Sequence, residues 1–334
     1  MNVALPADDT IYQEAVETAV IKVDPSRVEV TRTKEWIYFT SRDGLLASQG
    51  WKVHLSVVTR LAAKLIDVVV PHLLQRGVSF KISSSLKVTR QLNHGEGGLT
   101  QIGKLVTVYP SSDAEARELS LLLDELTVGW PGPDVPSDLS VSGRGAAWYR
   151  YGSFDGRFTQ LPTGELVGVV ANGEGGLELD RRTAPQPPSW LEDPIGGVVP
   201  EGRRFPLPAR FVPLRRIHTS PRGTVYSALD LSTSQLRCVK SAQRHSIETE
   251  DGADALSLLR YEHRVLSLLA SSGVVPEVYD FVDETWRAHL IMERIEGLSF
   301  EERVATLHLS GEAVTSERSE EHTSELQSHS DLVC

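Results

Sequence analysis

Cysteine is nearly absent from this sequence of 334 residues: only Cys238 and Cys334 occur, and there is no Cys-x-x-Cys pair. A disulfide scaffold and a cysteine-ligated zinc site are therefore not expected, and no other metal site is predicted. A reducing, cytoplasmic setting is the default expectation for such a sequence. The sequence also lacks a basic N-terminal signal region and any apolar run of about 20 residues, so neither a secretory signal nor a membrane span is predicted.

Basic residues are outnumbered by acidic ones, with 34 Lys and Arg against 45 Asp and Glu and a net charge of -11. A general nucleic-acid-binding protein normally has a basic face, so no nucleic-acid partner is expected. The chain does have 40% hydrophobic residues, which is enough for a buried core. Its length suits two domains.

Residues 50–56, in the first half, show the alternation of a half-buried strand. Val53 and Leu55 fall on one face, while Lys52 and His54 fall on the other, roughly 7 Å apart along the strand. The open face of such a strand usually carries small or neutral polar groups. A cation beside a titratable imidazole is therefore a candidate functional site.

Two further segments carry lysines in a similar setting. Lys81 occupies the polar face of a strand predicted at residues 78–82, and Lys104 opens a strand predicted at residues 104–109. If these strands are neighbours, the three lysines and His54 form a cationic pocket. Such a pocket suits a phosphate group and a proton transfer beside it.

Each of these residues also has a simpler interpretation. A single histidine such as His54 is more often a packed, hydrogen-bonded side chain than an acid. Lysines such as Lys52 and Lys81 commonly protect exposed strand edges. Arg150, between two tyrosines in a short aromatic strand, could make only a cation–π contact.

The segments between these strands predict helices and a loop. The helix at residues 60–76 should end at Gly77 and should be kinked or divided at Pro71. Residues 83–103 are rich in Ser, Gly and Asn, which predicts a flexible loop. A capping box that begins at Ser112 starts an amphipathic helix.

The second half has the predicted element order β-β-β-α-β-β, beginning near residue 211. Glu262 lies on the buried face of the helix predicted at residues 253–270, because its neighbours at i−3, i+3 and i+4 are apolar. A carboxylate in that place needs a cationic partner, and Lys240, at the end of a strand, is the natural one. The simpler interpretation is a small β-sheet domain with ordinary surface charges.

The motif Gly223-x-Val225-Tyr226 precedes this pair and the run Leu290-Ile291-Met292-Glu293 follows it. Together, these features resemble the N-lobe of a eukaryotic-type protein kinase. The resemblance implies an ATP site that needs Mg²⁺ in the intact kinase. No His-Arg-Asp or Asp-Phe-Gly motif follows residue 297, so the C-lobe is missing and this chain is not expected to phosphorylate a substrate. The residues implied for ATP binding are Gly223, Val225, Lys240, Glu262 and Glu293.

Four short motifs of the first half belong together: Gly50-Trp51-Lys52-x-His54-x-Ser56, Phe80-Lys81, Gly103-Lys104-x-x-Thr107 and Tyr149-Arg150-Tyr151-Gly152. In this order they resemble the lyase domain of class III/IV lanthipeptide synthetases, which is similar to bacterial phosphothreonine lyases. The resemblance implies elimination of phosphate from phosphoserine or phosphothreonine in a ribosomally made precursor peptide, giving dehydroalanine or dehydrobutyrine without a cofactor.

The resemblance also implies a role for each basic residue. Lys81 is the base that removes the α-proton, since neighbouring cations lower the pKa of a lysine. His54, with a pKa near neutrality, is the acid that protonates the leaving phosphate, and Lys52 stabilises the enolate-like carbonyl or the phosphate. Lys104 and Arg150 bind phosphate oxygens. The family usually has a basic residue after Ser137-Asp138, where this chain has leucine.

We therefore expect an α+β protein, with a mixed or antiparallel sheet and helices followed by the β-rich N-lobe of a kinase fold. Two alternatives remain open: a non-catalytic phosphopeptide- or leader-binding module with a pseudokinase lobe, or a Ser/Thr kinase with an N-terminal sensor domain. The last segment looks like a translated sequencing adapter, so the chain is expected to be a fragment. The predicted division is an N-terminal extension (1–48), a lyase-like domain (49–195), a linker (196–208), a truncated kinase N-lobe (209–316) and the adapter-derived tail (317–334).

Overall fold

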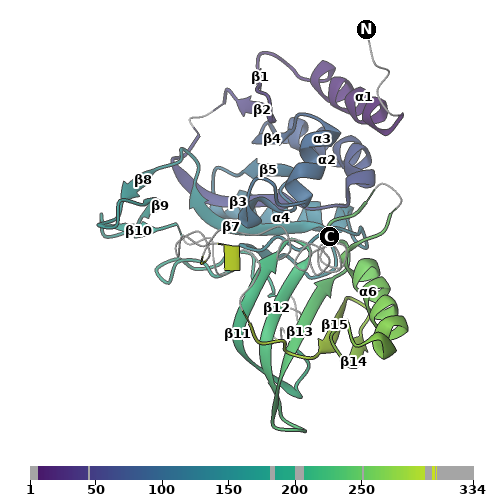
Figure 1. Ribbon diagram of the computed structural model, residues 1–334. Helices are drawn as coiled ribbons and strands as arrows, with labels where there is room; N and C mark the ends of the chain where they lie inside the picture. Colours follow the sequence, from purple (N-terminus) through teal and green to yellow (C-terminus); the bar gives the residue numbers. More distant parts are fainter. Residues whose placement is uncertain are drawn as a thin grey trace.

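The computed structural model describes residues 7–43, 46–180, 185–199, 207–249, 252–297, 303–304 and 306. These residues form an α+β protein with two large antiparallel sheets, a small third sheet and helices packed against them (Figure 1). The predicted tail at residues 317–334 lies outside the described residues. Within the described ranges, no helix has both the length and the apolar character needed to cross a membrane.

The first large sheet has seven strands, and all its neighbouring pairs are antiparallel. In spatial order the strands are β1 (Val28–Arg32), β2 (Trp36–Ser41), β4 (Ser79–Ser83), β5 (Val106–Tyr109), β3 (Gln49–Leu55), β7 (Ala147–Ser153) and β6 (Leu139–Ser140).

The division at residue 48 is wrong, because the preceding residues belong to this sheet and its core. β1 and β2 pair with each other, and β2 pairs with β4. Helix α1 (Ala7–Ile21) packs on the helical layer, and its Tyr12 is buried with its hydroxyl donating to the Ser83 carbonyl at 2.8 Å. The segment is thus part of the domain and not an extension.

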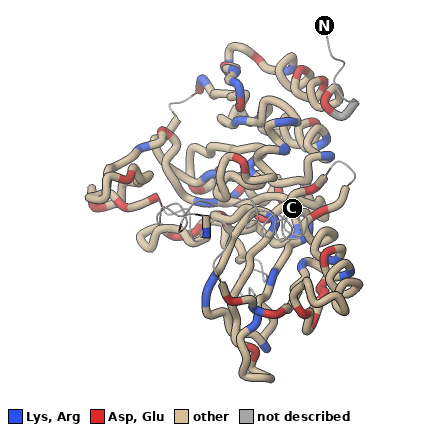
Figure 2. The backbone as a smooth tube through the Cα atoms, viewed as in Figure 1, with Lys and Arg blue, Asp and Glu red and all other residues tan. Residues whose placement is uncertain are grey.

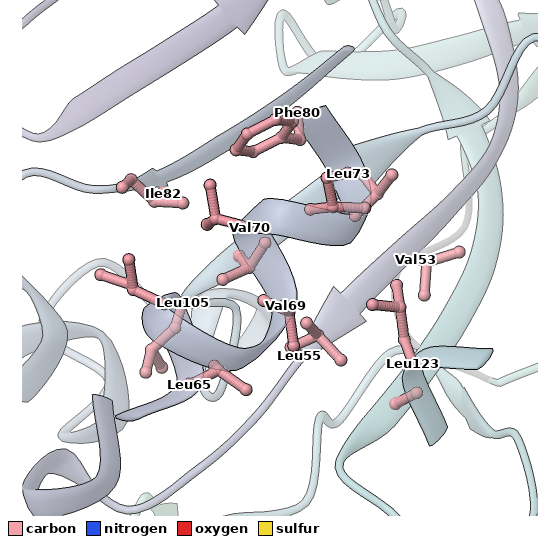
Figure 3. Close-up of a cluster of buried hydrophobic side chains, with 14 of the residues drawn as sticks. Val53, Leu55, Leu65, Val69, Val70, Leu73, Phe80, Ile82, Leu105 and Leu123 are labelled. Atoms are coloured by element: carbon pink, nitrogen blue, oxygen red, sulfur yellow. The ribbon is translucent and has the colours of Figure 1, made fainter. Parts of the chain in front are cut away.

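Helices α2 (Ala62–Arg76) and α4 (Asp113–Leu126) cover one face of the seven-stranded sheet. Their apolar stripes meet the inward-facing strand residues in a continuous core (Figure 3). This burial places every polar side chain that alternates with the core residues on the opposite face. Residues drawn from both layers include Val53, Leu55, Phe80, Leu65, Val69 and Leu123.

Two of the local predictions for the helices are confirmed, and the helix is not divided at Pro71. Gly77 has φ 65° and ends α2, and the Ser112 hydroxyl accepts from the Glu115 amide at 3.2 Å at the start of α4. Pro71, however, lies inside an unbroken α2. The buried residues on both sides of Pro71 pack on the sheet, and this packing outweighs the single hydrogen bond that proline removes.

The segment 83–103 is also more ordered than predicted. It contains helix α3 (Leu86–Asn93), whose first turn is capped by the Ser85 hydroxyl accepting from the Val88 amide at 3.2 Å. Two short 3₁₀ helices lie nearby, η1 (Thr59–Leu61) and η2 (Leu99–Gln101).

A small sheet projects from the side of the seven-stranded sheet (Figure 1). It is attached through Gln49, whose side-chain amide both donates to and accepts from the backbone of Ala171 at 2.7 Å. Its strands are β10 (Leu177–Leu179), β9 (Leu166–Ala171) and β8 (Phe158–Gln160), in spatial order.

The second large sheet confirms the predicted order β-β-β-α-β-β. Helix α6 (Ala255–Leu269) packs on one face, burying Leu256, Leu259 and Leu266, and ends in η3 (Ala270–Ser272). In spatial order the strands are β11 (Phe211–Ser220), β12 (Gly223–Asp230), β13 (Gln235–Gln243), β15 (Arg287–Met292) and β14 (Val278–Asp283).

One end of this second sheet abuts the first unit (Figure 1). Glu248, between β13 and α6, accepts from Arg60 Nε at 3.1 Å, and its carbonyl lies 3.3 Å from His94 Nε2. Figure 2 shows basic and acidic residues interspersed over both units.

Candidate active site

The strand register brings several of the predicted basic residues onto one face of the seven-stranded sheet. His54 on β3 lies opposite Thr107 on β5, which in turn lies opposite Lys81 on β4. Lys52 lies opposite Arg150 on β7. Because directly opposed residues share a face, these four basic side chains stand together on the side away from the core. β3 and β4 are separated by β5, so Lys81 and His54 are two strand spacings apart, about 10 Å.

Lys104 joins this group from a loop and not from a strand. β5 begins at Val106, so the strand predicted from residue 104 starts two residues late. Lys104 is buried, and its ammonium group donates to Ser137 Oγ at 2.8 Å and lies 3.3 Å from Asp138 Oδ1. The residue is thereby held beside the strand-borne group.

Asp138 is a central residue that the sequence reasoning missed. Its carboxylate lies 2.5 Å from His54 Nδ1 and accepts from Ser137 Oγ at 2.7 Å, and its side chain is fully buried. Two signals were available: the family pattern at Ser137-Asp138 noted above, and the rule that a buried group of cations needs a counter-ion. The sequence did not show which carboxylate would supply it, because residues 129–138 form a loop without periodicity.

The charges around His54 set its protonation state. Burial, together with the charges of Lys104 and Lys52, lowers the pKa of His54 to about 3, although Asp138 acts in the opposite direction. Burial would raise the pKa of Asp138, but Lys104 and His54 hold it well below its usual range. At neutral pH the ring is therefore neutral, with its Nδ1 hydrogen donated to an ionised Asp138. The expected pKa near neutrality is wrong for this site.

Lys81 has the protonation behaviour that the sequence predicted. Its side chain is half-buried on β4. Burial, together with the charge of Lys104, lowers the pKa of Lys81 to about 8. About one molecule in ten then carries a neutral Lys81 amine at pH 7.

Arg150 makes an ion pair and not the cation–π contact considered above. Its guanidinium pairs with Asp180, which follows β10, and both side chains are buried. Gly152 leaves the space for this pair, since a Cβ there would approach the guanidinium to 2.6 Å. Tyr149 and Tyr151 point to the other face, where both contact Trp51. Sequence reasoning gave no signal for Asp180.

The second sheet carries the ion pair that was predicted from the helix pattern. Lys240 Nζ on β13 donates to both carboxylate oxygens of Glu262 on α6, at 2.7 and 3.0 Å. Val225 on β12 lies opposite Lys240. Gly223 begins β12 where a Cβ would collide with the Ser241 carbonyl. Glu293 follows β15, and its backbone amide donates to the Glu277 carbonyl at 2.7 Å.

In the part of the chain that the structure describes, no cluster of three or more His, Cys, Asp or Glu side chains could hold a metal ion.

Comparisons with known proteins agree with the first half of the chain most directly. The family described as RamC, N-terminal domain, matches residues 17–198. A protein of Streptomyces coelicolor named probable SapB synthase is 33% identical over 294 residues, which cover 85% of this chain and 31% of that protein. The chain thus spans about a third of the length of this curated relative, at 31%.

One solved structure shows a weaker likeness. The type III effector and phosphothreonine lyase OspF from Shigella flexneri aligns over 44% of this chain and 76% of its own, with a TM-score of 0.31 and 14% identity. A likeness at this level supports no argument about the chemistry of this chain.

Proposed function

The chain belongs to the family of the RamC N-terminal domain, as its resemblance to class III/IV lanthipeptide synthetases indicated, and from this premise we propose a role in lanthipeptide-type biosynthesis. In this role it is a lyase that removes phosphate from phosphoserine or phosphothreonine in a ribosomally made precursor peptide. The products are dehydroalanine and dehydrobutyrine. The convergence of Lys52, His54 and Lys81 on one face of the sheet carries the proposal.

Lys81 starts the reaction in this scheme. Its neutral amine takes the α-proton, the Cα–H electron pair forms the new double bond, and the Cβ–O bond breaks so that phosphate leaves. The pKa of about 8 makes Lys81 a base that is both strong enough and partly unprotonated near neutral pH. Lys52 stabilises the negative charge that develops on the carbonyl oxygen or the phosphate.

His54 supplies the proton that the leaving phosphate takes up. Its ring is neutral among the protein's own charges, but an arriving phosphate adds negative charge beside it, and a neighbouring negative charge favours the protonated imidazole. Asp138 holds the ring through Nδ1, so the second nitrogen faces away from that carboxylate. Lys104 and Arg150 complete the group that binds the phosphate oxygens.

The second sheet is proposed to be the N-lobe of the kinase that prepares the phosphorylated substrate. The Lys240–Glu262 pair and the strand order support this assignment. In the intact kinase Gly223, Val225, Lys240 and Glu293 would contact ATP, which with Mg²⁺ supplies the phosphoryl group. A side chain at Gly223 would collide with the backbone of β13, so the pairing of β12 with β13 requires glycine at this position.

The test is mass spectrometry of a phosphoserine peptide incubated with the full chain. Loss of phosphoric acid is expected with the wild-type chain and with Lys87→Ala, which removes an exposed lysine of α3. No loss is expected with Lys81→Ala, although that variant should still bind the peptide in an anisotropy measurement. If the peptide stays intact with every leader sequence tried while it still binds, the domain is a binding module and not a lyase.

A further inference from the structure

Four aromatic side chains stand on the same face of the seven-stranded sheet as the candidate lysines. Trp36 and Tyr38 alternate with core residues on β2, and Tyr109 does the same at the end of β5. Phe154 follows β7 directly. All four residues are half-buried.

The first two rings surround Lys81. Its ammonium group lies 3.6 Å from the ring centroid of Trp36 and 5.9 Å from that of Tyr38. Contacts of this kind hold a cation over an aromatic face. The base proposed above therefore has an apolar wall on the β2 side.

The other two rings surround Lys52. Its ammonium group lies 6.0 Å from the ring centroid of Tyr109 and 5.7 Å from that of Phe154, and the two rings meet edge to face at 5.2 Å. Gly50 makes room for this arrangement, because a Cβ there would approach the Phe154 ring to 2.8 Å. The two lysines thus each have their own pair of aromatic neighbours.

The basic side chains of this face differ in burial. His54, Lys104 and Arg150 are buried, whereas Lys52 and Lys81 are half-buried. The group is closed at the His54 end and more open towards the aromatic side chains. A phosphate that reaches His54 from solvent must therefore leave the rest of its peptide over the aromatic end.

We propose that Trp36, Tyr38, Tyr109 and Phe154 form an aromatic rim that binds an apolar side chain next to the phosphorylated residue of the peptide. The inference rests on the proposed lyase function and adds the class of sequence that the site selects. The lysines attract the phosphate by charge, while the ring faces favour an aliphatic or aromatic neighbour over a hydrophilic one.

The experiment compares two phosphoserine peptides that differ only in the flanking residues, which are leucine in one and glycine in the other. Elimination is followed by mass spectrometry to give kcat/KM for each peptide with the full chain. The wild-type chain should prefer the leucine peptide about tenfold, equivalent to about 1.4 kcal/mol. Trp36→Ala and Phe154→Ala should reduce this ratio towards one.

The ratio is used because both peptides are measured with the same protein preparation. Partial unfolding or a changed Lys81 slows both peptides alike and leaves the ratio intact. Trp286→Ala, which removes an exposed aromatic residue beside the second sheet, should keep the tenfold preference. The proposed aromatic rim would be overturned by equal kcat/KM values for both peptides with the wild-type chain. It would also be overturned if both rim variants kept the wild-type ratio of kcat/KM. If neither peptide loses phosphate, the lyase function itself fails.

Discussion

His54 Nδ1 lies 2.5 Å from Asp138 Oδ2, and the other oxygen of the same carboxylate lies 3.3 Å from Lys104 Nζ. One buried negative charge therefore orients the imidazole and neutralises the lysine beside it. This arrangement explains how a site so rich in cations is tolerated in a folded sheet, since an unpaired buried charge is strongly destabilising.

Removing this carboxylate should cost both stability and activity. Asp138→Ala leaves Lys104 buried without its counter-ion, so the free energy of unfolding should fall by about 3–5 kcal/mol. Asp138→Asn keeps the shape and should lose less stability, but it should slow elimination because His54 loses its ionic partner. Urea unfolding and phosphate release measure the two effects. The control is Asp67→Ala, which removes an exposed carboxylate on α2 and should change the free energy of unfolding by no more than about 0.5 kcal/mol. An Asp138→Ala chain as stable as the wild type would contradict the argument.

The titration of Lys81 is a second expectation. Its pKa of about 8 means that the amine is charged below pH 8 and neutral above it, so the form that the elimination needs becomes the majority form only above pH 8. NMR of the chain with ¹³C-methylated lysines should show one resonance that titrates near pH 8. That resonance should disappear in Lys81→Ala. A spectrum in which no lysine titrates below pH 9 would rule out Lys81 as the base described here.

The sequence alone predicted the position of a side chain correctly where a short periodic pattern determined which face of the strand or helix it occupies. Alternation placed Lys52 and His54 on the polar face of one strand, and helical spacing placed Glu262 on the buried face of α6, where Lys240 is its partner. Both inferences need only the residues within one element and the rule that a buried charge requires a partner. The structure then confirmed both the shared strand face and the ion pair.

The parts that were missed depend on contacts between distant segments. Asp138 and Asp180 come from irregular or weakly patterned segments, and their partners His54 and Arg150 lie 84 and 30 residues away in the chain. The place of β2 next to β4 likewise follows from strand pairing across the sheet, which a single sequence does not encode locally. The predicted pKa of His54 was wrong for the same reason, since Asp138 and Lys104, which act on it, come from other segments of the chain.

The backbone conformation of Gly103 determines where the next residue, Lys104, is placed. Its φ is +73°, and an added Cβ would collide with Ser56 Oγ. Gly103→Ala should therefore lose about 1–2 kcal/mol of stability from the left-handed backbone alone, and the collision adds to this. It should also raise KM for the phosphopeptide by displacing Lys104. Gly98→Ala separates the two effects, because Gly98 has φ +95° with no atom within 4 Å of the added Cβ. A Gly98→Ala chain with the same rise in KM would refute the link to Lys104.

The Lys240–Glu262 pair and the basic side chains of the seven-stranded sheet should act independently once the peptide is already phosphorylated. Lys240 pairs with Glu262 in the second unit, whereas the proposed elimination uses only side chains of the seven-stranded sheet and its loops. Lys240→Met should therefore leave the rate of phosphate loss from a preformed phosphoserine peptide within about twofold of wild type, because a change within about 0.5 kcal/mol is usual away from a site. Lys52→Met, an identical replacement on β3, should slow the same reaction at least about a hundredfold if Lys52 stabilises the developing charge. Comparable losses in the two variants would mean that the second unit takes part in the elimination step, and the division of labour proposed above would have to be abandoned.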